Sequence, residues 1–555
     1  MRVWQLVKVI LALGLVIALS LAGCARPAPV PTPTPTPTTP TPTPTPAPTP
    51  TQAGPYERLK VALFTLGNEK FDPIAESATT ALQNLSPIFD ILLSGEGAKI
   101  TPGVAERWEL APDGLSWVFY IRKGIKFHNG EQLTADDVAF TINRYASQTA
   151  IQSDTRTMVE RVEKVDDYTV RVYTKGPQPF YPHIIAPFAR GQGLIQPKDY
   201  FEQYGIEYVS RHPVGSGPFK FVRYVPGDMI EYEALDKHWR QVCGFKKLTL
   251  IKIPEESTRI AMLKTGEVDA IEVSPESSVE VELAGFRTSA MTAEQATILL
   301  AGNYQPEAAS MPTSDIRVRQ ALSLAINKSE IIESLFYGKA LPVGPFPVHA
   351  VSADIDIPYW MDYAAKAYRY DPEEAKSLLK ETRWPDGFTI RLWAVNYPGA
   401  PYMPRLAEVV QAYWARIGVK AEIVTVDYSV YLAYRDTFKT PQWIGAAFTF
   451  ATSPNPAVPE RMVTAFRSTG HTHLFGKAMP EVDSMIDSAL TEMDPIKRKE
   501  IEDRLIKIIT DSYVSLMIAR VPSWIATGPR VDFDFPPPPS ASPFGYYLDT
   551  AKHKK

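Results

Sequence analysis

A tract of alternating proline and threonine, from Pro27 to Pro50, divides this chain of 555 residues into two unequal parts. Proline fixes its own backbone angle and has no backbone N–H to donate, so the tract cannot build a core and favours extended polyproline II. At about 3.1 Å per residue it would form a stiff stalk of very roughly 75–85 Å. A packed fold therefore has to come from the residues that follow, about 56–548.

The segment before the tract has the pattern of an export signal. Arg2 and Lys8 give it a positive start, and the run from Val9 to Ser20 is apolar and carries no charge. Such a run is short for a membrane span, which needs about 20 residues, and is typical of a signal peptide.

Small residues lead from this run to a cysteine, and Leu21-Ala22-Gly23-Cys24 resembles a bacterial lipobox. In that resemblance Cys24 is acylated, residues 1–23 are a lipoprotein signal peptide and 24–55 a lipid-anchored stalk. Two or more acyl chains hold a protein firmly on a membrane. We therefore expect the protein on the outer face of the bacterial cytoplasmic membrane, in the periplasmic space if an outer membrane exists. A plain secretory signal with a chance cysteine is the alternative.

The composition excludes several classes of protein. Lys and Arg number 58 against 62 Asp and Glu, a formal net charge of −4 that leaves no electrostatic footprint for nucleic acid. A hydrophobic content of 45% rules out general disorder. The two cysteines, Cys24 and Cys243, are too few for a disulfide framework or a cysteine-rich metal centre.

Strand-like and helix-like patterns alternate along the body. Apolar and alternating runs predict strands at 59–64, 117–121, 168–173, 389–395 and 419–426. Capping residues predict helices after Thr134 and after Asp371, and apolar periodicity predicts another over 406–417. This mixture indicates α/β or α+β layers.

Motifs along the body carry a family resemblance. Trp108, Asp113-Gly114, Phe119-Tyr120-Ile121-Arg122-Lys123-Gly124, Phe127-His128-Asn129-Gly130 and Leu133-Thr134-Ala135-Asp136-Asp137-Val138 come first. The later motifs are Pro213–Phe219, Gly227–Trp239, Leu263–Ala270, Asp315–Ile326, Tyr370-Asp371-Pro372 and Ile417-Gly418-Val419. Together they resemble, in order, the family 5 solute-binding proteins of oligopeptide, dipeptide and nickel ABC importers.

The resemblance implies an α/β fold of the periplasmic-binding-protein type, with two lobes, a cleft between them and an extra inserted subdomain. We expect lobe I at 56–86, 190–285 and 510–549, the subdomain at 87–189, and lobe II at 286–509. Hinge closure around a ligand is the expected motion. The expected partners are a small-molecule solute, the ABC permease subunits and the membrane, and the chain is expected to be a monomer.

We find no constellation that predicts catalysis, and we expect no cofactor. His471 and His473 form a pair without a clear third metal ligand, so the sequence leaves open whether they touch a bound solute. Gly215-Ser216-Gly217 lacks the lysine and the length of a phosphate loop. We interpret it as a tight turn in which glycine supplies a positive φ.

An enclosed ligand needs aromatic walls and a few polar groups that fix its orientation. Three stretches at predicted strand ends and in loops offer both, and packing in the core is the alternative for each. The candidate residues are Asn303, Tyr304, Trp393, Asn396, Tyr397, Trp443, Phe448, Thr449 and Phe450. By resemblance, the region from Trp443 to Pro456 lines the pocket.

One departure from the family concerns charge. Peptide-binding relatives often carry an aspartate in this region that pairs with the ligand's α-amino group, but here no Asp or Glu occurs between Asp436 and Glu460. Enclosing an ammonium without a counter-charge is costly. Either another lobe supplies the anion, or the ligand is an oligosaccharide, an opine-like solute, a modified peptide or a metal chelate.

The sequence thus predicts the substrate-binding component of an ABC importer, which captures a peptide-sized solute and is not an enzyme. A surface sensor or adhesion module, or a secreted cell-wall enzyme on the same fold, is the alternative.

Overall fold

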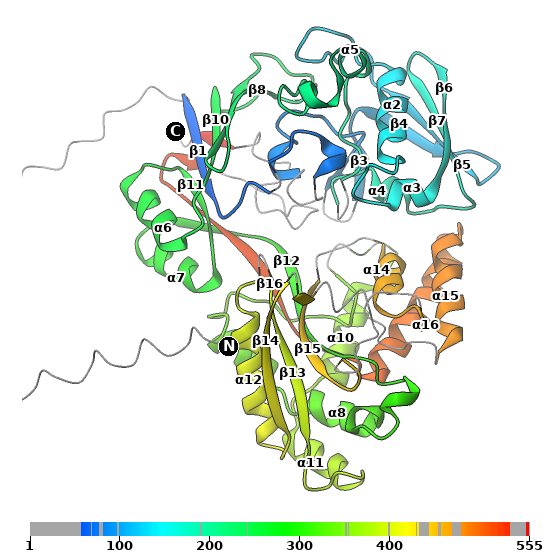
Figure 1. Cartoon of the computed structure of the whole chain (residues 1–555), viewed down its shortest axis with the longest axis vertical. Helices are drawn as coiled ribbons and strands as arrows, with labels where there is room; N and C mark the ends of the chain where they lie inside the picture. The colour runs from blue at the N-terminus through cyan, green and yellow to red at the C-terminus, as the bar shows by residue number, and fades with distance from the viewer. Residues whose placement is uncertain are drawn as a thin grey trace, which may run out of the picture. The chain divides into compact units, whose positions relative to one another are not determined.

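The computed structural model describes residues 57–532 and 551–553, except 68, 77–81, 97–98, 189–190, 241, 350–351, 353, 398–399, 429, 432–442, 453–456 and 469–478 (Figure 1). The predicted signal peptide, Cys24, the stalk, His471 and His473 lie outside these residues. Within the described residues, no helix combines the length and the apolar character that a bilayer crossing requires.

Ten strands form one mixed sheet, in the order β14-β13-β15-β12-β16-β11-β1-β10-β9-β8. β13 runs parallel to β14 and β15, β1 runs parallel to β10 and β11, and β12 and β16 are antiparallel to each other. The strands are β1 (Arg58–Leu63), β8 (Phe219–Val225), β9 (Met229–Ala234), β10 (Lys247–Lys252), β11 (Ala270–Val273), β12 (Arg287–Leu300), β13 (Thr389–Asn396), β14 (Lys420–Asp427), β15 (Ala447–Thr452) and β16 (Ser515–Thr527).

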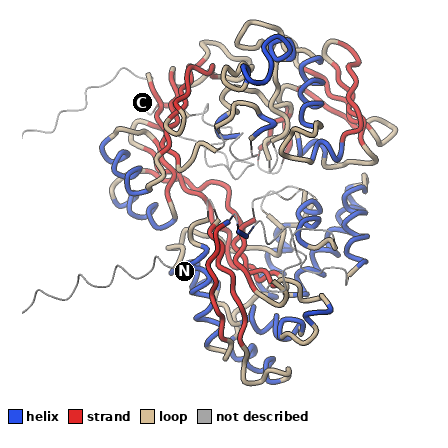
Figure 2. The backbone as a smooth tube through the Cα atoms, in the orientation of Figure 1, coloured by secondary structure: helices blue, strands red, loops and turns tan. Residues whose placement is uncertain are grey.

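The two longest strands, β12 and β16, make this sheet continuous. β16 pairs with β11 through residues 524–527 and with β12 along nearly its whole length, and β12 pairs with β15 through residues 295–300. Figure 2 shows both strands running on from one group of strands to the other. Their register shifts between Ala290 and Ala293 and again between Ala296 and Thr297, which marks two irregular points along the connection.

Helices cover both faces of the sheet around β13. Leu392 faces a core shared with α8, α9, α11 and α12, whereas Trp393, one residue on, faces a core shared with α10, α14, α15 and α16. Successive strand residues point to opposite faces, so β13 is buried on both sides. The helices are α8 (Ile316–Leu324), α9 (Lys328–Ser334), α10 (Ile357–Ala367), α11 (Pro372–Lys380), α12 (Met403–Ala415), α14 (Val458–Ala465), α15 (Pro480–Thr491) and α16 (Pro495–Ser512), with 3-10 turns η2 (Pro306–Ala308) and η3 (Pro312–Ser314).

The group of strands around β1 is covered in the same way. Ala62 packs against α6 and α7, while Val61 and Leu63 face a second core that includes Leu85 and Ile88. The elements that complete this part are α5 (Lys198–Val209), α6 (Glu256–Thr265), α7 (Pro275–Leu283), η1 (Pro73–Ala75), β17 (Val531–Asp532) and β18 (Lys552–His553).

A separate four-stranded sheet, in the order β4-β5-β7-β6, has its own core with Phe119, Val138 and Tyr181. The predicted cap is confirmed, since the Thr134 side chain and Asp137 form a capping box at the start of α2. The elements are β2 (Leu93–Glu96), β3 (Lys99–Pro102), β4 (Ala105–Leu110), β5 (Ser116–Ile121), β6 (Val159–Asp166), β7 (Thr169–Thr174), α2 (Ala135–Tyr145), α3 (Asp154–Met158) and α4 (Tyr181–Ile184).

The predicted strands and helices are confirmed to within a few residues, but the interpretation of Gly215 and Gly217 is wrong. Neither glycine has a positive φ. A Cβ would lie 2.1 Å from the Ile88 carbonyl oxygen at Gly215 and 2.6 Å from the Pro87 carbonyl oxygen at Gly217. Close approach of another backbone segment, and not the turn itself, therefore requires these glycines.

His128 is held at the same junction in its neutral form. Its Nε2 lies 2.9 Å from the Gly217 carbonyl oxygen, and its Nδ1 accepts a hydrogen bond from the Gly215 N–H at 3.4 Å. A neutral ring that donates through Nε2 and accepts through Nδ1 satisfies both contacts. Burial lowers the pKa of His128 to about 4, with Lys220 and His238 contributing, while the Gly217 carbonyl and Asp90 act in the opposite direction.

We expect this histidine to make the fold sensitive to acid. As the pH falls from about 6.5 to 4, His128 binds a proton in the unfolded chain but not in the native protein. The free energy of unfolding therefore falls by about 3 kcal/mol over this range. Denaturant unfolding of His128→Gln should show a flatter dependence over this range than the native chain, whereas the exposed His212→Gln should match the native chain. An unchanged slope in His128→Gln would contradict the assignment.

Candidate ligand-binding site

The carboxyl ends of three parallel strands meet at one edge of the sheet. β13 ends at Asn396, which lies opposite Asp427 at the end of β14, and β15 ends at Thr452. The side chains of the first two residues are in contact, because Asn396 Nδ2 donates to Asp427 Oδ1 at 3.3 Å. The corresponding edge is where open α/β sheets bind ligands.

Seven aromatic side chains from β13, β15 and the segments near them form a cluster, here called the aromatic cluster. Its closest ring pairs are Trp443 with Phe448, at 4.9 Å between centroids, Tyr397 with Tyr428, at 5.1 Å, and Trp393 with Trp443, at 5.3 Å. The cluster comprises Trp393, Tyr397, Tyr428, Tyr431, Trp443, Phe448 and Phe450.

Burial separates the cluster into two layers. Trp393, Trp443 and Phe448 are at most 8% exposed and pack into the core over α14 and α16. Tyr397 and Phe450 are only half-buried, and their rings lie 6.1 Å apart in an edge-to-face arrangement. The inner rings thus support the outer ones, which are the part of the cluster that can meet a ligand.

The remaining candidates have structural contacts of their own. Thr449 is fully buried on the other face of β15, and its Oγ1 accepts a hydrogen bond from the Val395 N–H at 3.0 Å. Asn303 Nδ2 donates to the Leu300 carbonyl oxygen at 2.7 Å, and the Tyr304 hydroxyl accepts from Arg319 at 2.9 Å.

The direction of β12 keeps Asn303 and Tyr304 away from the edge formed by Asn396 and Thr452. β12 is antiparallel to β15, so Leu300 at its end lies opposite Ala447, the first residue of β15. The two candidates follow Leu300 and therefore leave the sheet at the opposite edge.

Three polar residues in register extend the candidate edge across β15, β12 and β16. Gln295 lies opposite Thr452 on one side and opposite Arg520 on the other. Directly opposed residues share a face of the sheet, and this is the face of Phe448 and Phe450. We call these three residues the polar row. The sequence gives only a weak signal for this row, because Glu294 and Thr297 also interrupt the apolar residues of 293–300, and Ser515 those of 514–521.

Several buried polar atoms of this region have no hydrogen-bond partner in the part of the chain that the structure describes. They are Gln295 Oε1, His349 Nε2 and Thr452 Oγ1, on side chains at most 3% exposed. His349 adjoins the row because Gln295 Nε2 donates to the carbonyl oxygen of Val348 at 2.5 Å. Burial lowers the pKa of His349 well below its usual value, and the charges of Arg461 and Arg520 act in the same direction.

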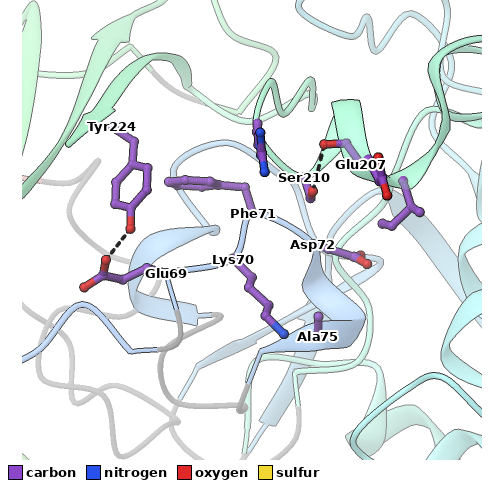
Figure 3. Close-up of a pocket in the computed structure, with 10 residues that line it drawn as sticks. Glu69, Lys70, Phe71, Asp72, Ala75, Glu207, Ser210 and Tyr224 are labelled. Atoms are coloured by element: carbon purple, nitrogen blue, oxygen red, sulfur yellow. Dashed lines mark hydrogen bonds between the residues drawn. The ribbon is translucent and has the colours of Figure 1, made fainter. Parts of the chain in front are cut away.

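Two cavities of about 380 and 580 Å³ lie elsewhere, beside η1 and α5. Figure 3 shows the first of them. Asp72, Ala75 and Ile206 line both of them. Two of the three acids that line them are engaged within the protein, since Glu69 accepts from the Tyr224 hydroxyl and Asp72 pairs with Arg144 at 2.8 Å. None of the predicted ligand residues lines either cavity.

The chain matches one family of known proteins over more than half of its length. The family model described as "Bacterial extracellular solute-binding proteins, family 5 Middle" matches residues 99–470. The chain belongs to this family of solute-binding proteins. The sequence is similar to the dipeptide-binding protein of Escherichia coli, with 31% identity over 406 residues that cover 66% of this chain and 71% of the relative. The family is one of substrate-binding proteins, and the recognition made from the motifs is confirmed.

Two further comparisons extend the similarity. Heme-binding protein A of Haemophilus influenzae is 29% identical over 487 residues, which cover 80% of this chain and 83% of the relative. The solved structure of HbpA2 from Haemophilus parasuis superimposes with a TM-score of 0.73 at 25% identity, over 90% of this chain and 100% of that one. The predicted α/β fold of two-lobed periplasmic binding proteins is confirmed.

We expect Thr449 to act on stability through its hydrogen bond to β13. Thr449→Val keeps the shape of the side chain but removes the acceptor of the Val395 N–H, which should lower the free energy of unfolding by about 1–3 kcal/mol. The matched change Thr425→Val, at an exposed position of β14, should have little effect on the denaturant midpoint. Equal midpoints for the two variants would contradict this role.

Proposed function

We propose that this protein captures a peptide-sized organic solute outside the membrane and delivers it to the permease of an ABC importer, with no chemical step. Membership of the solute-binding family supports the reading. The observation that carries it is the aromatic cluster beside the polar row, at the carboxyl-end edge of the sheet. Aromatic walls with a few orienting polar groups are the usual make-up of a small-molecule site.

In this proposal Tyr397 and Phe450 contact the solute, and Asn396 contributes a polar group. Trp393, Trp443 and Phe448 do not contact the solute in this proposal; they pack against the outer rings and fix their positions. Asn303 and Tyr304, which leave the sheet at the opposite edge, have no part in this site, and Thr449 ties the two strands together.

We also propose that β12 and β16 form the hinge between the predicted lobes. A pair of connecting strands can absorb a change in backbone angles without unpacking the cores at either end. The solute then favours closure only through contacts it makes in the closed form and not in the open one. The lobe boundaries given above remain a prediction.

The proposed place of action is the membrane surface. We infer that Cys24 carries the acyl chains and that the Pro/Thr stalk holds a monomeric body at a distance from the bilayer. A tethered body of this kind can meet solutes outside the cell and remain near a permease.

Binding should be measurable as a rise in thermal stability. A solute present at about 100 times its Kd stabilises the native state by about 2.7 kcal/mol. We expect some members of a panel of short peptides, opines and oligosaccharides to raise the melting temperature of the mature chain, and Phe450→Ala to weaken their binding at least tenfold. The control Tyr337→Ala changes an exposed aromatic residue elsewhere. No shift with any compound, together with no co-purified mass in native mass spectrometry, would count against import.

Lipid attachment has its own test. In cells grown with labelled palmitate, the native chain should carry label and partition into detergent. Cys24→Ala should lose both properties, whereas Cys243→Ala should keep them. Retention of label in Cys24→Ala would refute the anchor.

A further inference from the structure

Arg520 is a half-buried arginine that has no acidic partner in the part of the chain that the structure describes. It lies in the middle of β16, and its Nε donates to the carbonyl oxygen of Pro342 at 2.9 Å. No Asp or Glu among the described residues forms an ion pair with it. Burial lowers the pKa of Arg520.

The described residues that share the sheet face of Arg520 in the polar row are neutral, and Glu294, which lies opposite Val521, belongs to the other face. Gln295 stands opposite it in the polar row, with Thr452 beyond, and both are neutral. Burial lowers the pKa of His349, and the positive charges of Arg461 and Arg520 lower it further, so this histidine is neutral. Among the described residues, the charged side chains that shift the pKa of His349 are thus both cations, Arg461 and Arg520.

A charge removed from water needs a compensating partner. Arginine is suited to carboxylates because its guanidinium presents two parallel N–H groups to two oxygens. The neighbouring Thr452 hydroxyl has no partner in the described chain and can donate to the same anion. The one acid that ends a strand at the candidate edge among the described residues, Asp427, lies on β14, away from β16 in the strand order, and no Asp or Glu occurs in 437–459. This distribution of charge fits a solute with an anionic group beside Arg520.

We propose that the polar row binds an anionic group of the transported solute, with Arg520 as its counter-charge and Thr452 as a second donor. The solute class is an organic carboxylate. This inference rests on the proposed function, since it assumes that the solute binds along the aromatic cluster. It adds the charge of the group that the protein selects.

The test compares acids with their own amides. The probes are N-acetyl-trialanine, N-acetyl-tetraalanine and gluconic acid, each beside its uncharged amide, and binding to the mature chain is measured by calorimetry. We expect at least one acid to bind tenfold or more tightly than its amide. Arg520→Gln, which keeps an N–H for Pro342, should abolish the difference. Arg383→Gln removes an exposed arginine and should preserve it.

The other outcomes separate the two proposals. Equal binding of acid and amide, or a difference that survives in Arg520→Gln, overturns the anionic subsite and leaves solute capture standing. Failure of all six compounds to bind at 10 mM counts against both. Without any solute, Arg520→Gln should unfold at or above the native temperature. A lower temperature would mean that the charge has a partner within the protein, and would overturn the inference.

Discussion

The pairing of β12 with β16 is the interaction on which the rest of the structure depends. The two strands are hydrogen-bonded from Arg287 and Thr527 to Leu299 and Ser515, and they join two groups of strands that each have cores of their own. Every other strand of the ten is added outward from this pair. Since β12 also sets the direction of β15, the pair determines which strand ends meet at the candidate edge.

The site follows from that direction together with the alternation of side chains along each strand. Phe448, Phe450 and Thr452 share one face of β15, and the register carries the same face to Gln295 and Arg520. Aromatic and polar groups are therefore neighbours although they are distant in sequence. The helices α14 and α16 close the core behind the inner rings, so the outer rings rest on a rigid support.

The parts of this structure that local chemistry determines were predictable from the sequence. The capping box at Thr134, the proline start of α11 and the end of α12 near Gly418 depend on neighbours within a few residues. Contacts between distant segments were not predictable. The position of Asn303 and Tyr304 at the other edge depends on the antiparallel pairing of β12 with β15, and the position of Gln295 in the polar row depends on its cross-strand partners.

The glycines at 215 and 217 determine how the four-stranded unit is attached to the larger sheet. Gly217 N–H donates to the Ile88 carbonyl oxygen at 2.7 Å, and the carbonyl oxygen of Gly215 receives the backbone N–H of His128 at 2.8 Å. Three stretches of chain that are remote in sequence are thereby joined by main-chain hydrogen bonds, in addition to those of the His128 ring. Deleting the four-stranded unit would expose the main-chain groups of Gly215 and Gly217 to water. A shortened chain would therefore need new hydrogen-bond partners for them. The four-stranded unit thus contributes to the stability of the larger sheet and cannot be removed without affecting it.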